Sequence, residues 1–144
     1  MDLVMEDKNM PKIAIIGSRD WTNQRKTKDI IWGLKQKFGE ELTIVSGGCP
    51  TGADKLARKF ALELGVQYEE FNPAHTPKNL YSMMPESYYG KEYHVTQFHH
   101  RNDLIAKHAD YCIALIPKTA SKSTGTAYTI KRFKKLGKRV VIIE

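Results

Sequence analysis

Short runs of β-branched and other apolar residues alternate with amphipathic helical patterns along the chain, and this alternation constrains the fold more than any other feature. The expected strands are Lys12–Ile16, Leu42–Ser46, Val66–Phe71, Tyr111–Ile116 and Arg139–Ile143. Most of these runs are apolar at successive positions, as in strands that are covered on both faces. The pattern therefore predicts an α/β fold with a doubly wound, mainly parallel five-stranded sheet and helices on both faces.

Helical patterns lie between the expected strands. The residues that carry them are Ile30, Ile31, Leu34 and Phe38; Leu56, Ala57, Phe60, Ala61 and Leu64; Leu104, Ile105 and His108; and Ala127, Ile130 and Phe133. Gly39, Gly65 and Gly137 follow three of these patterns, where left-handed helix caps are expected. A chain of 144 residues is too short for two ordinary domains. We expect one domain over residues 12–144, after an N-terminal extension over residues 1–11.

Composition and charge indicate a globular protein with an anionic partner. No apolar run approaches the roughly 20 residues of a membrane span, and the opening MDLVMEDKNM lacks the pattern of a secretory signal, so we expect a cytoplasmic protein. Cys49 and Cys112 form no CxxC pair, so neither a disulfide framework nor a zinc site is expected. The net charge of +7 favours polyanions or anionic small ligands.

Loops rich in glycine and hydroxyl groups follow the first, second and fourth expected strands. They are GSRDW (residues 17–21), GGCPTG (residues 47–52) and PKTASKSTGT (residues 117–126). In a doubly wound sheet, ligands bind outside the carboxyl ends of the strands, where the winding reverses. Glycines let backbone amides approach a ligand, and a following helix presents unpaired N–H groups, so we expect a phosphate-binding edge. Tight glycine turns also occur for purely structural reasons, and the spacing matches neither a dinucleotide fingerprint nor a P-loop.

The order of the short motifs resembles that of one known superfamily. The motifs are GSRDW, VSGGCPTGAD, NPA, YG, RN, ADYCIAL, KSTGT and GKRVVII, and they extend from about Lys12 to Ile143. They resemble the small, often phage- or bacterially encoded branch of the SLOG superfamily, which includes the Lonely Guy phosphoribohydrolases and the DNA-processing protein A family. The resemblance implies a Rossmann-like sheet, a nucleotide-derived ligand such as an immune signal and, by analogy, a homo-oligomer.

One departure from the Lonely Guy pattern affects the expected chemistry. These enzymes carry PGGxGTxxE, whose glutamate assists cleavage of the N-glycosidic bond, whereas this sequence has KSTGTAYT with Thr129 in the glutamate's place. A hydroxyl with a pKa far above 7 cannot act as that carboxylate. We therefore expect ligand binding without catalysis and without a cofactor. The alternatives are a nucleotide N-glycosidase that uses another carboxylate, such as Asp20 or Asp54, and a single-stranded DNA-binding protein.

The expected ligand contacts follow from the chemistry of each group, with the resemblance in support. The ligand-binding residues are expected to be Gly17, Ser18, Arg19, Ser46, Gly47, Gly48, Thr51, Gly52, Ala53, Asp54, Arg101, Asn102, Ser123, Thr124, Gly125 and Thr126. The amides of residues 47–48 and 52–53 are expected to hold phosphate oxygens. Gly125 and Thr126 are expected to form an opposite lip.

Several side chains have two possible roles. Thr51 either joins the phosphate site or caps the helix. Asp54 either accepts from ribose hydroxyls or complements the helix dipole. Arg19 either contacts the ligand, through phosphate or by stacking on a base, or is an ordinary surface side chain. Arg101 and Asn102, expected near the start of the helix before the fourth strand, belong to the pocket according to the resemblance; otherwise they are a surface arginine and a helix-capping asparagine.

Other segments also have more than one interpretation. The connection over residues 72–96 is long and rich in Tyr and Met, and its aromatic rings either stack on a base or pack onto the protein. Four of the five histidines lie between residues 94 and 108 without a metal-binding spacing such as HExxH, so no metal site is expected. The basic run Lys131–Arg139 is either a solvated helix face or a DNA-binding surface.

Overall fold

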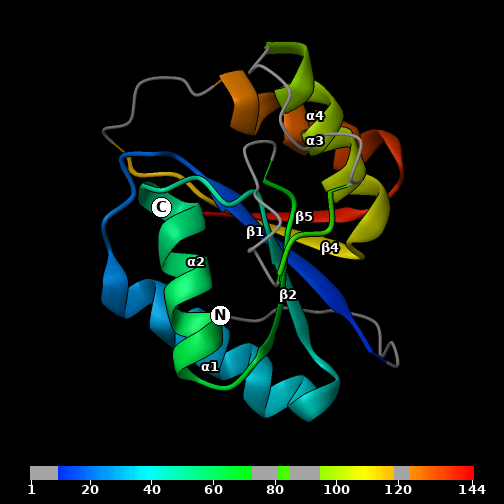
Figure 1. The fold of residues 1–144 in the computed structure, drawn as a ribbon. Coiled ribbons are helices and arrows are strands. Elements are labelled where there is room, and N and C mark those ends of the chain that lie inside the picture. The colour runs from blue at the N-terminus through cyan, green and yellow to red at the C-terminus, as the bar shows by residue number, and fades with distance from the viewer. Residues whose placement is uncertain (1–9, 73–80, 85–94, 119–123) are drawn as a thin grey trace.

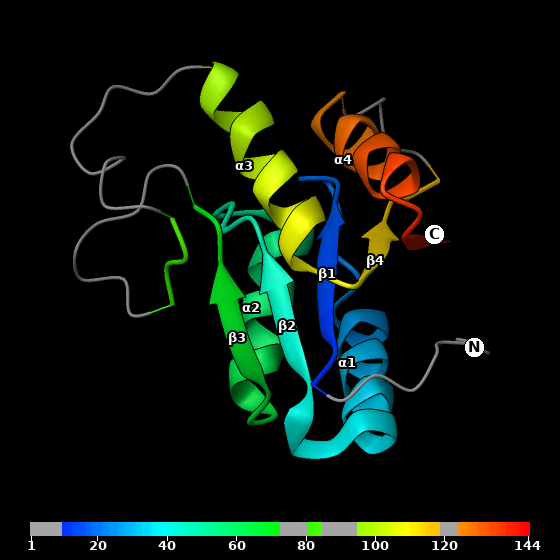
Figure 2. The same ribbon diagram turned by 90° about the vertical axis from the view of Figure 1, so that its right-hand side faces the viewer.

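The computed structural model contains one five-stranded sheet between two layers of helices (Figures 1 and 2). It describes residues 10–72, 81–84, 95–118 and 124–144. The strands are β1 (Lys12–Gly17), β2 (Thr43–Ser46), β3 (Gln67–Glu70), β4 (Tyr111–Leu115) and β5 (Arg139–Ile143). The helices are α1 (Gln24–Phe38), α2 (Gly52–Glu63), α3 (Val95–His108) and α4 (Thr124–Lys135), with a short 3-10 helix, η1 (Gly39–Glu41). The expected fold class is confirmed.

All strand pairs are parallel, in the order β3-β2-β1-β4-β5. Ile13 of the central strand β1 lies opposite Ile44 of β2 on one side and Tyr111 of β4 on the other. The chain therefore winds outward from β1 to β3 in one direction and from β4 to β5 in the other. The winding reverses between β1 and β4, and the carboxyl ends of these strands mark the edge where ligands bind in such sheets.

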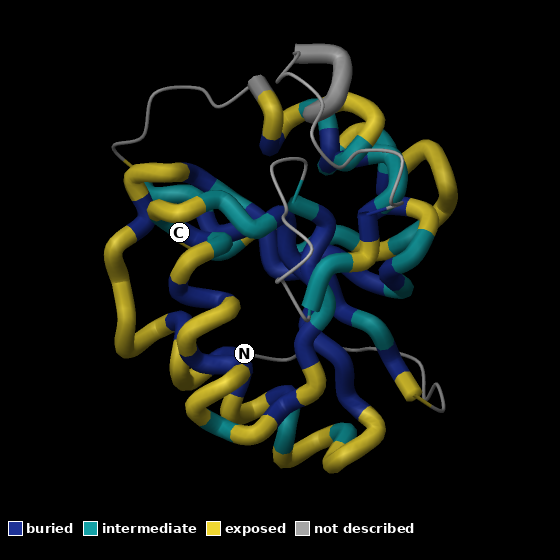
Figure 3. Tube along the Cα trace, in the orientation of Figure 1, coloured by how far each residue is buried: buried dark blue, intermediate teal, exposed yellow. Residues whose placement is uncertain are grey.

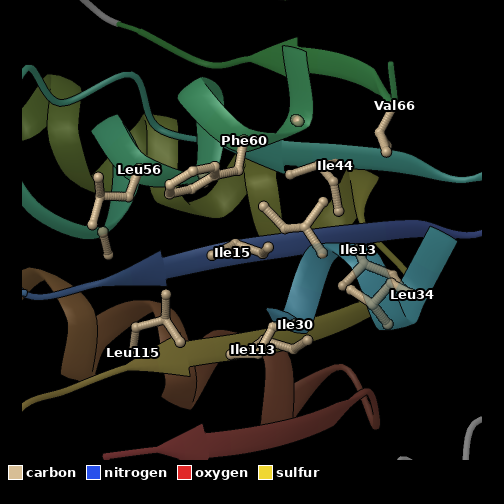
Figure 4. Packing of buried hydrophobic residues seen from close by; sticks show 14 of the residues in the cluster. Ile13, Ile15, Ile30, Leu34, Ile44, Leu56, Phe60, Val66, Ile113 and Leu115 are labelled. Atoms are coloured by element: carbon tan, nitrogen blue, oxygen red, sulfur yellow. The ribbon is translucent and has the colours of Figure 1, made fainter. Parts of the chain in front are cut away.

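Each face of the sheet packs on its own apolar cluster. Successive strand side chains point to opposite faces. Ile13 and Ile15 therefore pack with α1 and with Phe60 of α2 (Figure 4), whereas Ala14 packs on the other face with Ile105 of α3. Burial is almost continuous along β1, β2 and β4 (Figure 3). None of the helices in the described residues is both long and apolar enough to cross a membrane.

The helix ends agree with the sequence in two places and differ in two. Gly65 and Gly137 have φ values of 72° and 71°, as expected for left-handed caps. Gly39 also has a positive φ of 67°, but its ψ of −145° lies outside the left-handed helical region. The prediction that Arg101 and Asn102 lie near a helix start is wrong, because α3 begins at Val95 and places them in its middle. The start of α3 was not apparent from the sequence, because the residues around this pair are polar. Arg101 contacts the carbonyls of Gly47 and Phe71 on other elements, which a search for an apolar helix face does not detect.

Candidate ligand-binding edge of the sheet

The loop after β1 lies directly against the start of α2 at Gly52. This glycine has a φ of 72°, and a Cβ there would lie 2.3 Å from the carbonyl oxygen of Ser18 and 2.5 Å from the Cα of Arg19. The Ala53 amide donates to the same Ser18 carbonyl at 3.1 Å. Only glycine fits, because another side chain would meet backbone atoms in a strained conformation. The loops after β1 and β2 therefore meet at this edge.

The carboxyl ends of β1 and β4 are also in close contact, and the contact lies at Gly17. A Cβ on Gly17 would lie 2.1 Å from the carbonyl oxygen of Leu115 and 2.9 Å from the Cβ of Ala53. The Ser18 amide donates to the Leu115 carbonyl at 3.0 Å. The point where the winding reverses is thus packed tightly against the first turn of α2.

Asp54 supplies an internal acceptor for the glycine loop after β2. The Cys49 amide donates to Asp54 Oδ2 at 3.2 Å, and the Gly47 amide is also hydrogen-bonded to this carboxyl group. Asp54 lies in the first turn of α2, so its carboxylate can reach the loop that precedes the helix. The Asp54 carboxylate therefore binds two amides of the loop that precedes its helix.

Other predicted amides and hydroxyls of this edge are also hydrogen-bonded within the protein. Gly48 donates its amide to Ser46 Oγ at 3.3 Å, and Ser18 Oγ accepts from the Asp20 amide at 3.0 Å. The amides of Gly47, Gly48 and Ala53, which we expected to hold phosphate oxygens, thus have acceptors within the protein in this structure. The physical reason is that buried backbone amides need acceptors, and nearby side chains and carbonyls provide them.

Arg101 joins α3 to the glycine loop. Its Nη1 donates to the carbonyl oxygens of Gly47 at 2.6 Å and Phe71 at 3.4 Å, and its Nε donates to Asn102 Oδ1 at 2.8 Å. Asn102 is buried. The pair thus lies at the carboxyl ends of β2 and β3, and Asn102 does not cap α3.

The pKa of Asp54 is raised above its ordinary value because burial disfavours the charged carboxylate. The nearby guanidinium of Arg101 and the amides of Cys49 and Gly47 oppose this effect, whereas the charge of Glu70 adds to it. Arg101 therefore acts as the counter-charge of a carboxylate held inside the edge.

Glu70 is a functional candidate that the sequence analysis missed. Its side chain is only 1% exposed, and it accepts a hydrogen bond from the Tyr68 hydroxyl at 2.8 Å. Arg58 of α2 lies 3.6 Å away, and Ser46 Oγ hydrogen-bonds with the Tyr68 hydroxyl at 2.6 Å. The alternation in QYEE places Tyr68 and Glu70 on one face of β3, which is the signal that could have identified this carboxylate. We call Ser46, Asp54, Tyr68, Glu70 and Arg101 the rim network.

Loss of the Tyr68 hydroxyl is expected to destabilise the rim network. Tyr68→Phe removes a donor to a buried carboxylate and should lower the free energy of unfolding by about 1 to 3 kcal/mol. Tyr128→Phe is the matched control, because its hydroxyl bonds to Asp103 at the surface and its loss should have little effect. Urea unfolding of both variants measures the difference, and equal midpoints would contradict a structural role for Tyr68.

Arg19 and Thr51 are the predicted contacts that face solvent where the two loops meet. Both residues are exposed. Thr51 occupies the N-cap position of α2, but its side chain makes no capping hydrogen bond. Because the Arg19 backbone packs on Gly52, these two side chains extend from adjacent points of the edge.

The third predicted loop is described only from its helical end. Ser123 lies outside the described residues, and Thr124 begins α4. Gly125 is exposed and Thr126 is buried. Thr129 is 2% exposed, and its hydroxyl donates to the Gly125 carbonyl at 2.9 Å. The residue in the glutamate's place is therefore a buried hydroxyl with an internal partner.

The described part of the long connection packs onto the protein. The ring of Tyr81 lies edge-on to Tyr68 with centroids 5.7 Å apart, and Met84 is buried. Tyr88, Tyr89 and Tyr93 lie outside the described residues. No group of three His, Cys, Asp or Glu side chains suited to a metal ion occurs in the part of the chain that the structure describes.

A family model matches part of the sequence that builds this edge. The model described as "YspA, cpYpsA-related SLOG family" (YAcAr) matches residues 11–76. The resemblance to the SLOG superfamily is confirmed over these residues. The matched SLOG segment contains β1, β2 and β3 and both glycine loops that meet at Gly52. Comparison with curated protein sequences gave no match.

Solved structures share the fold over 92% to 94% of this chain. DNA processing protein A from Helicobacter pylori, described by its single-stranded DNA binding mode, has a TM-score of 0.68 at 21% identity, covering 94% of this chain and 66% of that one. The molybdenum cofactor binding protein of Rippkaea orientalis has a TM-score of 0.65 at 18% identity, covering 92% and 75%. The molybdenum cofactor carrier protein of Chlamydomonas reinhardtii has a TM-score of 0.57 at 18% identity, with the same coverage.

Proposed function

We propose that the protein binds a nucleotide-derived ligand, of the ADP-ribose or cyclic ADP-ribose type, at the carboxyl ends of β1 and β2 without cleaving it. The observation that carries this proposal is the contact at Gly52, because it holds the exposed Arg19 beside the exposed Thr51 at the start of a helix. A guanidinium and a hydroxyl at a helix N-terminus suit a phosphate group. Sequestration of an immune nucleotide signal, as in phage counter-defence, is the specific form of this role.

Hydrogen bonds within the protein limit which groups of this edge can contact the ligand first. Since Asp54 and Ser46 already accept from the loop amides, the first contacts with phosphate come from Arg19, Thr51 and the first turn of α2. The descriptions of two similar structures as molybdenum cofactor binding and carrier proteins support a small-molecule cargo.

The burial and hydrogen bonding of the Thr129 hydroxyl support ligand binding without cleavage. A general base must face the ligand with an unprotonated acceptor near neutral pH, and a stabiliser of a ribosyl cation must face it with a negative charge. The Thr129 hydroxyl is instead buried and bonded to the Gly125 carbonyl. Chromatography after incubation with AMP, ADP-ribose and cyclic ADP-ribose tests this point, and release of free base at catalytic turnover would refute a binding-only role.

Arg19→Ala is expected to weaken ligand binding about 10- to 100-fold, because a charge-assisted hydrogen bond contributes about 1.5 to 3 kcal/mol. The measurement is the rise in melting temperature with added ADP-ribose or cyclic ADP-ribose, since a ligand that binds only the folded state must stabilise it. Arg25→Ala is the control, because this side chain is 94% exposed on α1. If the two variants gave equal ligand-induced shifts, the proposed edge would be the wrong site.

Single-stranded DNA binding is the second candidate function. The fold similarity to DNA processing protein A and the exposed lysines Lys131, Lys134 and Lys135 of α4 support it. Phosphate contacts of this kind weaken steeply with salt. Titration of a labelled single strand at increasing salt, with and without replacement of these lysines by glutamine, separates this function from small-ligand binding at the edge.

A further inference from the structure

Asp54 is a carboxyl group of the proposed ligand-binding edge. Its Oδ2 accepts from the Cys49 amide at 3.2 Å, and the Gly47 amide is hydrogen-bonded to the same carboxyl group. Backbone amides at the start of a helix are also groups that bind phosphate oxygens. The loop after β2 therefore combines amides that suit an anion with an anionic group of the protein itself.

The proposed ligand phosphate lies close to this carboxyl group. Thr51 is the N-cap residue of α2, and Asp54 lies in the first turn of the helix. Residues three positions apart on a helix have Cβ atoms about 5 to 6 Å apart. Cys49 donates its amide to Asp54, while its Sγ lies 3.8 Å from the Thr51 hydroxyl. An anion held by Arg19 and Thr51 is thus a near neighbour of Asp54.

The charged groups that face Asp54 come from the elements packed against it. Arg101 of α3 favours the ionised form of Asp54, whereas the charge of Glu70 on β3 disfavours it. Glu70 itself lies 3.6 Å from Arg58 of α2 and accepts from the Tyr68 hydroxyl at 2.8 Å. Burial raises the pKa of Asp54, so its neutral form is more accessible than that of an exposed carboxyl group.

We propose that Asp54 takes up a proton when an anionic ligand binds at this edge, so that ligand affinity falls as the pH rises. This coupling deepens the proposed function and rests on it, because it concerns the same ligand and the same edge. A ligand phosphate adds a like charge near the carboxylate, and a like charge favours the protonated form. By linkage, affinity is highest where Asp54 is already protonated in the free protein, and it falls between the free and the ligand-bound pKa of this group.

Titration calorimetry of the unmodified chain with ADP-ribose measures the proton uptake directly. Both phosphates of ADP-ribose are diesters, so their charge does not change near neutral pH. Titrations in two buffers with different enthalpies of ionisation should show uptake of up to about one proton per ligand. The dissociation constant should rise about tenfold between about pH 5 and about pH 9. A constant affinity over this range, with equal heats in both buffers, would refute the coupling.

Asp54→Asn should abolish the pH dependence, because the amide keeps the shape of the carboxyl group without its titration. At high pH this variant should bind ADP-ribose more tightly than the unmodified chain does. Asp20→Asn is the matched control, because Asp20 is an exposed carboxylate of the loop after β1. Cys49→Ser is a second control, because it removes the nearby thiol but keeps the amide that donates to Asp54. Both controls should retain the pH dependence, and its persistence in Asp54→Asn would overturn the assignment to Asp54.

The outcomes separate this coupling from the proposed function. ADP-ribose binding that is weakened by Arg19→Ala but is independent of pH would contradict the coupling and leave the proposed function intact. If ADP-ribose bound at no pH, the proposed function would fail, and the coupling would fail with it.

Discussion

Gly52→Ala should lower the free energy of unfolding by about 2 to 5 kcal/mol. Two costs combine in this estimate. A left-handed backbone at φ 72° disfavours alanine, and its Cβ would lie 2.3 Å from the Ser18 carbonyl oxygen. Because that carbonyl also accepts from the Ala53 amide, relief of the clash must separate the loop after β1 from α2. Urea unfolding measures the change in stability.

Gly137→Ala is the control that separates these two costs. Gly137 has a φ of 71°, but a Cβ there meets nothing within 4 Å. This variant should therefore lose only the conformational cost, about 1 to 2 kcal/mol. Gly52→Ala should also displace Arg19 and weaken the ligand-induced rise in melting temperature, whereas Gly137→Ala should preserve it. Equal losses of stability in the two variants would mean that the loops do not press on each other at Gly52.

Arg101→Met should lower the free energy of unfolding by about 2 to 3 kcal/mol at neutral pH, because it removes charge-assisted hydrogen bonds from a partly buried site. The Gly47 carbonyl loses its 2.6 Å donor, and Asp54 loses the cation that favours its charged form. Arg25→Met at the fully solvated surface of α1 should change stability little. Unfolding of both variants across a pH series is the measurement.

The effect of Arg101→Met should depend on pH in a defined direction. The pKa of Asp54 is already raised in the folded state by burial, and loss of the guanidinium raises it further. The folded protein then holds a proton that the unfolded chain releases, so stability falls as pH rises from the ordinary value of 3.8 through the folded pKa. The loss in Arg101→Met should therefore be larger at pH 8 than near pH 4. Adding Asp54→Asn should remove this difference, and a loss independent of pH in the single variant would contradict the coupling.

Strand positions could be predicted from the sequence because apolar runs have abrupt ends. The run RVVII lies between Lys138 and Glu144, and the expected strand and β5 have the same bounds. The start of α3 could not be predicted in this way, since Arg101 and Asn102 are polar residues whose contacts lie on other parts of the fold. Helical periodicity detects an apolar face, and this helix begins before that face does.

The glycine loops were predictable as turns at one edge of the sheet, but their hydrogen-bond partners were not. Sequence identifies which amides can donate, whereas only the folded chain shows that Asp54 and Ser46 accept from them. Glu70 was missed for a related reason. A carboxylate in a strand is ordinarily solvated, and its burial depends on Tyr68 and on Arg58 from another element.

The central position of β1 has a consequence for how the chain folds as it leaves the ribosome. The Lys12 amide donates to the carboxyl group of Asp110, 98 residues further along the chain. The part of the sheet made of β1, β2 and β3 is synthesised first, and one side of β1 then stays unpaired until β4 emerges. Nascent chains with such exposed strand edges are prone to associate with one another. Rapid synthesis of the C-terminal half, or protection of β1 by a chaperone until then, should therefore determine how much protein reaches the native state.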